Sequence, residues 1–216
     1  MRIPRNQDFR GENYNPKSPF LFAFPNTMTR EELRKSLLSL NLSKRQEEQP
    51  HRQRMLELLD SGVDCFRRDA FPAHFTGSAL VVSAEGARCL LHHHRKLDRW
   101  LQFGGHCDGE EDVLSVAQRE ACEESGIEGL IVASRRPFDL DIHDIPAIGD
   151  EPPHFHYDIR YVLIAPERAE FRTSPESTEL RWFSTDEAQR LELDAGLRRM
   201  VDKWKSLLAR RAHSDL

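Results

Sequence analysis

The chain has 216 residues, enough for one domain with a well-formed core and an extension, or for two small domains. Its 31 basic and 36 acidic residues give a net charge of −5, which argues against a broad nucleic-acid surface, because a phosphate backbone selects for an excess of Lys and Arg. The scattered cysteines, the lack of a secretory signal and the lack of an apolar run of roughly 18 residues predict a cytoplasmic protein with reduced thiols and no membrane contact.

The first 70 residues predict an arm followed by helices. Residues 1–26 show neither helical nor strand periodicity and are interpreted as an extended arm. Thr29 stands three residues before Glu32, which is the spacing of a capping box, and leucines then recur at helical spacing. A second amphipathic helix is expected over residues 51–60, after a polar break. Residues 27–70 therefore form a predicted helical extension, which could pack on the following domain, cover a cleft or dimerise.

From about residue 75 the pattern changes to short runs of β-branched and aliphatic residues. AEG between two such runs predicts a hairpin, GGHCDGE is interpreted as a loop, and a helix is expected over residues 111–124. The final helix carries an apolar stripe that includes Trp204 and is interpreted as core or as a contact in a homodimer. The fold class predicted is α/β, a sandwich around a mixed sheet. Strands are expected at residues 75–83, 87–94, 97–103, 129–134, 137–145, 154–165 and 179–184, and the final helix at 194–210.

The residues that carry chemistry lie in GGHCDGEEDVLSVAQREACEESGI, residues 104–127. Glu120, Glu123 and Glu124 fall within an arc of about 100° at the C-terminal end of the predicted helix. Like charges at this spacing repel each other, and the helix dipole disfavours carboxylates at this end. A hard divalent cation such as Mg²⁺ would relieve both effects. A solvated acidic helix end is the alternative explanation for the helix taken alone.

The spacing of the whole segment resembles the Nudix box, G-x5-E-x7-R-E-U-x-E-E-x-G-U, in which U is aliphatic. Ala121 is smaller than the usual Leu or Val at the first U position. The resemblance implies an α/β/α Nudix sandwich, here predicted as a domain of residues 75–212 that follows the helical extension and includes the C-terminal helix. Every fixed position of the motif is matched, by Gly105, Glu111, Arg119, Glu120, Glu123, Glu124 and Gly126.

The resemblance also implies a divalent-metal-dependent hydrolase, which uses Mg²⁺ or Mn²⁺ to direct water onto a phosphorus atom of a diphosphate linkage. Carried onto this chain, the metal ligands would be Glu120, Glu123, Glu124 and the carbonyl of Gly104. Glu111 and Arg119 would fix the loop and orient the ligand carboxylates.

Further candidates lie outside the motif. Glu176 is the first candidate for the general base or an additional ligand; Glu179 and Glu151 are alternatives, and each is also explained as a solvated loop residue. His106 and His156 are candidates for contacts with substrate, against the simpler explanation of hydrogen bonding within the fold. Phe103 and Trp100 could stack on a base, although Trp100 is also explained as core.

The motif does not choose the substrate. The expected partner is a small nucleotide-like molecule, such as a nucleoside diphosphate linked to another group. The net acidity makes a long RNA less favoured than a small nucleotide, and an RNA 5′ end is the one nucleic-acid partner left open. Two alternatives remain open: a non-catalytic Nudix-like nucleotide-binding or regulatory domain, and an isoprenyl diphosphate isomerase, for which Cys107 is the residue to check.

Overall fold

The computed structural model describes residues 27–43, 45–147 and 149–214. The arm predicted for residues 1–26 lies outside the described residues. Among the described helices, none has the length and apolar character needed to cross a membrane.

In the described part of the chain, one mixed sheet of eight strands organises the fold, with β1 (Ala73–Val82) near its centre. β1 runs parallel to β7 (His154–Ile164) along its whole length. On its other side it pairs antiparallel with β4 (Phe103–His106) and, further along, with β2 (Arg88–His94). The remaining strands extend the sheet by antiparallel pairing: β3 (Arg99–Leu101) and β8 (Ser177–Ser184) with β2, and β5 (Ile131–Val132) and β6 (Asp139–Ile145) with β7.

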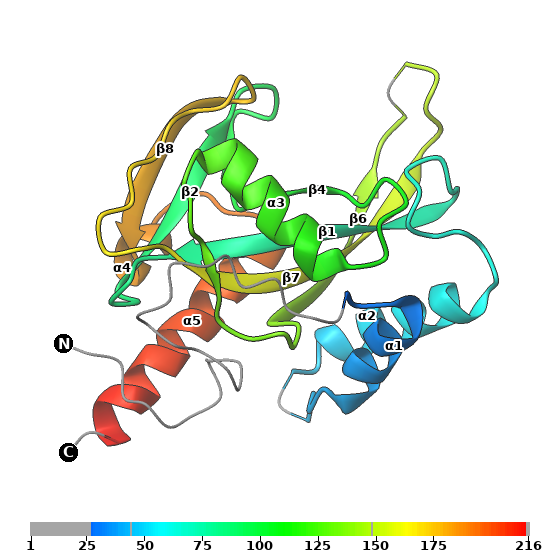
Figure 1. The fold of residues 1–216 in the computed structure, drawn as a ribbon, viewed down its shortest axis with the longest axis horizontal. Coiled ribbons are helices and arrows are strands. Elements are labelled where there is room, and N and C mark those ends of the chain that lie inside the picture. Colours follow the sequence, from blue (N-terminus) through cyan, green and yellow to red (C-terminus); the bar gives the residue numbers. More distant parts are fainter. Residues whose placement is uncertain (1–26, 44, 148, 215–216) are drawn as a thin grey trace.

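Helices cover both faces of this sheet, as Figure 1 shows. Successive side chains of a strand point to opposite faces, and β1 follows this rule. Ala79 and Val81 pack in the core beneath α3 (Val113–Ser125), whereas Leu80 and Val82 pack in the core beneath α5 (Ala195–Ser214). The short helix α4 (Thr185–Ala188) joins β8 to the segment before α5. The predicted α/β sandwich around a mixed sheet is therefore confirmed.

The N-terminal extension forms two helices, α1 (Arg30–Ser39) and α2 (Glu48–Asp60). The capping box of Thr29 and Glu32 is present as predicted. α2 begins before the predicted residue 51 and includes Pro50. Proline is tolerated there because an N–H in the first turn of a helix has no partner within the helix. The buried apolar side chains of both helices join the core beneath α3. Of the three arrangements left open by the sequence, the extension thus packs on the domain.

Two predictions for the centre of the chain need correction. The segment GGHCDGE is a strand as far as His106, since Gly104 and Gly105 pair with Ser78 and Gly77 of β1. The loop begins only at Cys107. Helix α3 starts at Val113, with Asp112 as its N-cap, so Glu111 precedes the helix.

A buried network of charges lies on the α5 face of the sheet. Arg160 of β7 hydrogen-bonds to Asp158 at 2.6 Å and to Asp141 at 2.9 Å. Arg199 of α5 contacts Asp141 and Asp139 at 2.8 Å each. Burial alone would lower the pKa of the Arg160 guanidinium, but the surrounding carboxylates raise it. The network therefore stays ionised and ties α5 to β6 and β7.

Replacing Arg160 with Met should lower the free energy of unfolding by about 3–5 kcal/mol, because buried carboxylates would lose their partner. Urea denaturation monitored by circular dichroism measures the change. Arg34→Met, which removes an exposed ion pair with Asp60, is the matched control and should shift the transition little. Equal stability of the Arg160→Met and parent proteins would contradict the proposed weight of the network.

Candidate active site

Two glycines allow α3 to lie directly against the sheet. Gly77 of β1 and Gly105 of β4 are opposite each other in the antiparallel pair. A Cβ atom on Gly77 would lie 2.6 Å from the carbonyl oxygen of Val113, and one on Gly105 would lie 2.5 Å from the carboxyl carbon of Glu120. A side chain at Gly77 would meet the backbone of α3, and one at Gly105 would displace the carboxyl group of Glu120. The end of α3 that bears the glutamates is consequently held close to β4.

This packing buries part of the acidic helix end. Glu124 is 9% exposed and accepts a hydrogen bond of 3.0 Å from the backbone N–H of Gly104. The side chain of Glu120 is 18% exposed, whereas that of Glu123 is 62% exposed. The explanation of a fully solvated acidic helix end is therefore wrong for Glu124 and Glu120, although Glu123 does face solvent.

Burial sets the electrostatics of these groups. It raises the pKa of Glu124 to about 8, and the neighbouring charges of Glu120, Glu176 and Glu123 add to the effect. Burial also raises the pKa of Glu120, against the opposing influence of Arg119. Two partly desolvated carboxylates on one helix face thus lack enough positive charge for both to ionise easily.

Arg119 partly compensates this charge. Its guanidinium lies 2.5 Å from Glu120 and 3.8 Å from Glu123, and it donates a long hydrogen bond of 3.5 Å to the carbonyl oxygen of His106. Arg119 thus lies beside the carboxylates and the glycine segment, and its supporting role stays a prediction.

Glu111 has a different surrounding. It accepts a hydrogen bond of 2.9 Å from the backbone N–H of Arg30, at the start of α1. The adjacent Asp112 accepts one of 2.9 Å from the N–H of Met28 and also caps α3. Glu111 therefore fixes the loop to the N-terminal extension. Its side chain contacts Arg30 rather than the candidate metal ligands on α3.

Of the acids predicted outside the motif, Glu176 is the one whose charge raises the pKa values of the box glutamates Glu120 and Glu124. It is exposed, in the turn before β8. Glu179 lies on β8 opposite His93. The charge of Glu151 acts on His106 instead. The structure thus brings Glu176, rather than either alternative, toward the candidate metal ligands.

The predictions for aromatic residues fare less well. Phe103 is 0% exposed and stacks on His92 with ring centroids 5.2 Å apart, so the prediction that it stacks on a base is wrong. Trp100 packs edge-on against Phe183. Trp204 is buried in the core beneath α5, which supports the core interpretation of its helix stripe.

His106 and His156 do come together, with Nε2 atoms 3.3 Å apart. A third histidine, His74, joins them, and sequence reasoning missed it. Its register partner on β7 is His156. Because this parallel pairing joins residues 82 positions apart, no local signal in the sequence could have linked them.

Residues 74–204 match the family model described as the NUDIX domain. The chain belongs to the NUDIX family. The resemblance drawn from the box is thereby confirmed, and with it the assignment of the chain as a Nudix-type pyrophosphohydrolase.

Similar solved structures include a C. elegans Ap4A hydrolase in a binary complex, with 21% identity, a TM-score of 0.48 and coverage of 62% of this chain and 97% of that chain. A NUDIX-family hydrolase from Clostridium perfringens shows 20% identity, a TM-score of 0.46 and coverage of 62% and 97%. The MutT protein from Methanosarcina mazei Go1 shows 21% identity, a TM-score of 0.44 and coverage of 61% and 92%. No curated protein matches the chain.

Nudix hydrolases generally use divalent metal ions, and the residues of this box fit one. Glu124 and Glu120 are partly desolvated carboxylates with raised pKa values, next to the glycine segment. A divalent cation would favour their ionised form and supply the positive charge that Arg119 alone does not.

The metal-free Nudix domain should lose stability as the pH rises. The pKa of Glu124 is about 8 in the folded chain against an ordinary value of 4.5, so between these values the folded state holds a proton that the unfolded state has released. The free energy of unfolding therefore falls as the pH rises through this range. The free energy of unfolding is measured in the presence of a metal chelator at several pH values above the ordinary pKa of histidine. It should fall with pH in the parent but not in Glu124→Gln. Parallel pH dependences of the two proteins would contradict the assignment.

The two facing glycines should differ in what they control. Gly105→Ala places its methyl group against the mobile end of Glu120, so metal affinity should fall about 10–100-fold with little loss of stability. Gly77→Ala meets the backbone of Val113 and should lower the unfolding midpoint instead. Calorimetric titration with Mn²⁺ and thermal unfolding separate the two effects. Unchanged Mn²⁺ affinity in Gly105→Ala would contradict the close approach of Glu120 to β4.

Proposed function

We propose that the chain is a divalent-metal-dependent hydrolase that cleaves the diphosphate linkage of a nucleoside diphosphate-linked small molecule by attack of water on phosphorus. The observation that carries the proposal is the partial burial of Glu124 and Glu120 beside the glycine segment of an intact Nudix box. Such burial is unfavourable for ionised carboxylates unless a cation shares the site.

In this proposal Glu120, Glu123, Glu124 and the carbonyl of Gly104 hold Mg²⁺ or Mn²⁺, ions that prefer oxygen ligands. The ion, when bound, neutralises charge on the phosphates and lowers the pKa of the attacking water. The Gly104 N–H orients the carboxylate of Glu124, and Arg119 orients that of Glu120. Glu176 is the proposed general base, because it is an exposed carboxylate within electrostatic reach of both glutamates.

The proposed substrate is small. A net charge of −5 gives little electrostatic attraction for a long RNA, so an RNA 5′ end is the less favoured alternative. The free cysteines fit the reducing cytoplasm that we propose as the location.

Neither alternative function gains support from the site. Cys107 is 2% exposed and burial raises the pKa of its thiol, which disfavours the thiolate that an isomerase would need. A non-catalytic nucleotide-binding domain has no use for carboxylates held partly desolvated around a cation site. The following experiment distinguishes such a binding domain from a hydrolase.

The proposal is tested by measuring the release of phosphate from a panel of substrates, with and without an added phosphatase. The panel contains nucleoside triphosphates, nucleotide sugars, dinucleoside polyphosphates, coenzyme A and capped RNA. The parent should turn over at least one class in Mg²⁺ or Mn²⁺. Glu124→Gln should reduce kcat about 100-fold or more, since metal stabilisation of charge is worth several kcal/mol.

Glu179→Gln is the matched control, because Glu179 is an exposed acid of β8 that pairs opposite His93 of β2, and the activity of this variant should equal that of the parent. Glu176→Gln should lower kcat about 100-fold or more if Glu176 is the base. Binding of nucleotides, detected by thermal shift, without turnover in either metal would favour the binding domain. Equal turnover by the parent and Glu124→Gln would overturn the metal site.

A further inference from the structure

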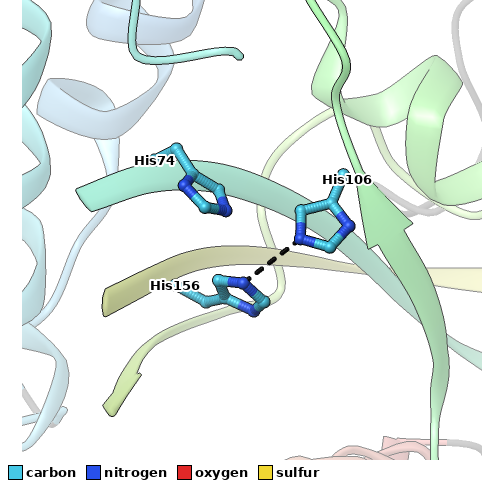
Figure 2. A group of neighbouring side chains, drawn as sticks. All are labelled: His74, His106 and His156. Atoms are coloured by element: carbon cyan, nitrogen blue, oxygen red, sulfur yellow. Dashed lines mark hydrogen bonds between the residues drawn. The ribbon is translucent and has the colours of Figure 1, made fainter. Parts of the chain in front are cut away.

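Histidines gather where the ends of four strands meet. His74 of β1, His106 of β4, His143 of β6 and His154 and His156 of β7 are neighbours there. Figure 2 shows the rings of His74, His106 and His156 turned toward one another across three strands. None of these five rings belongs to the Nudix box ligand set, and the proposed hydrolysis makes no use of them.

Their placement differs from that of the box carboxylates. Gly105 faces Glu120 of α3, so the next residue of β4, His106, points to the opposite face of the sheet. His74 and His156 are a register pair, and both alternate with side chains of the core beneath α3. The histidines are therefore separated from Glu120 and Glu124 by the sheet itself.

The distances suit a metal ion. One ring nitrogen from each of His74, His106 and His156 lies within 4.8 Å of the others, the only such set of three His, Cys or acidic residues among the described residues. The Nε2 atoms of His106 and His156 are 3.3 Å apart. Two histidine nitrogens bound at 2.0–2.1 Å to a tetrahedral ion are separated by about 3.3 Å. Small side-chain movements would thus complete a three-histidine site.

The hydrogen bonds orient the rings for this role. His74 is 1% exposed; its Nδ1 faces the carbonyl of Ala70 at 3.4 Å, and its Nε2 is buried without a hydrogen-bond partner. The Nδ1–H that donates to this carbonyl leaves the lone pair on Nε2, directed into the cluster. Metal-bound histidines characteristically donate their other ring N–H to a carbonyl or carboxylate in this way.

His154 shows the same pattern. Its Nδ1 lies 2.9 Å from the carbonyl of Pro152, and its Nε2 lies 3.3 Å from Nε2 of His156. His143 likewise places Nδ1 3.3 Å from the carboxylate of Asp141. The Nε2 atoms of neighbouring rings therefore face one another. A neutral imidazole carries one N–H, and where that proton is on Nδ1, Nε2 has a lone pair but no hydrogen to donate. These nitrogens consequently cannot all hydrogen-bond to one another.

The charge of the cluster also favours a cation as its ligand. Burial lowers the pKa of His74 to about 4 and that of His156 to about 2. Neutral imidazoles are metal ligands, whereas a phosphate site would need protonated ones. Around them, the carboxylates of Asp108 and Glu151 oppose the positive charge of Arg68.

We propose that His74, His106 and His156 bind one Zn²⁺ ion at a structural site on the face of the sheet opposite α3. Imidazole nitrogen is a ligand suited to Zn²⁺, whereas the carboxylates of the box suit Mg²⁺ or Mn²⁺. His154 lies outside this set of three, but its Nε2 is 3.3 Å from that of His156, so a movement of its ring would let it supply the fourth ligand. The ion joins the ends of β1, β4 and β7, so it stabilises the strand that carries Gly104 and Gly105.

Equilibrium dialysis against Zn²⁺ in excess Mg²⁺, followed by elemental analysis of the purified full chain, tests the site. Excess Mg²⁺ occupies the carboxylates, so the parent should retain about one Zn²⁺ per chain, given a single site of this ligand set. His106→Gln and His156→Gln should weaken Zn²⁺ binding at least about tenfold, an effect expected when a ligand is removed. His93→Gln changes a histidine of β2 outside the cluster, so it should bind Zn²⁺ like the parent. Glu124→Gln should also bind like the parent.

Two further readouts do not depend on activity. Zn²⁺ should raise the thermal unfolding midpoint of the parent and of Glu124→Gln but not that of His156→Gln. Co²⁺ should give the strong visible bands of a four-coordinate ion in the parent, and these should be absent in His106→Gln. Circular dichroism confirms folding of each variant; His106 and His156 are used because they are less buried than His74.

The proposal is overturned if Zn²⁺ is not retained by the parent, or if the histidine variants bind it as the parent does. It is equally overturned if Glu124→Gln loses Zn²⁺ while His156→Gln keeps it, because the ion would then occupy the Nudix box.

Discussion

Helix α3 lies directly against β1 and β4 because Gly77 leaves room for the helix backbone and Gly105 leaves room for the carboxyl group of Glu120. This contact brings Glu124 within hydrogen-bond distance of the Gly104 N–H and removes much of the water around it and Glu120. A carboxylate that has lost its water needs either a proton or a cation. The raised pKa of Glu124 and its fit to a divalent ion are thus two consequences of one steric fact.

The segment between β4 and α3 is restrained from both sides. On one side Arg119 joins Glu120 to the carbonyl of His106. On the other side the backbone N–H groups of Met28 and Arg30 donate to Asp112 and Glu111. The N-terminal extension therefore contributes to the position of the Nudix box, even though the matching family model begins only at residue 74. Truncation between these regions would remove contacts of the site as well as part of the core.

Local patterns predicted the elements well, and long-range pairing accounts for what they missed. The capping box at Thr29, the acidic end of α3 and most strands follow from spacing within about ten residues. The strand character of Gly104 and Gly105 depends on pairing with β1, so glycine alone suggested a loop. His74 joins His156 only through the parallel β1–β7 pair. Likewise, nothing local in the sequence shows that Arg160 and Arg199 share buried aspartates.

Two sets of donors on opposite faces of one sheet would let this chain separate two metals by chemistry. Carboxylate oxygens and a carbonyl suit ions that keep part of their water, as a phosphate-bound Mg²⁺ does, while desolvated neutral imidazoles suit Zn²⁺. β4 contributes to both, through the backbone of Gly104 and the side chain of His106. An ion on the histidine face would therefore restrain the strand that positions the carboxylates, without itself reaching the substrate. Stability on one face and hydrolysis on the other then share a single strand.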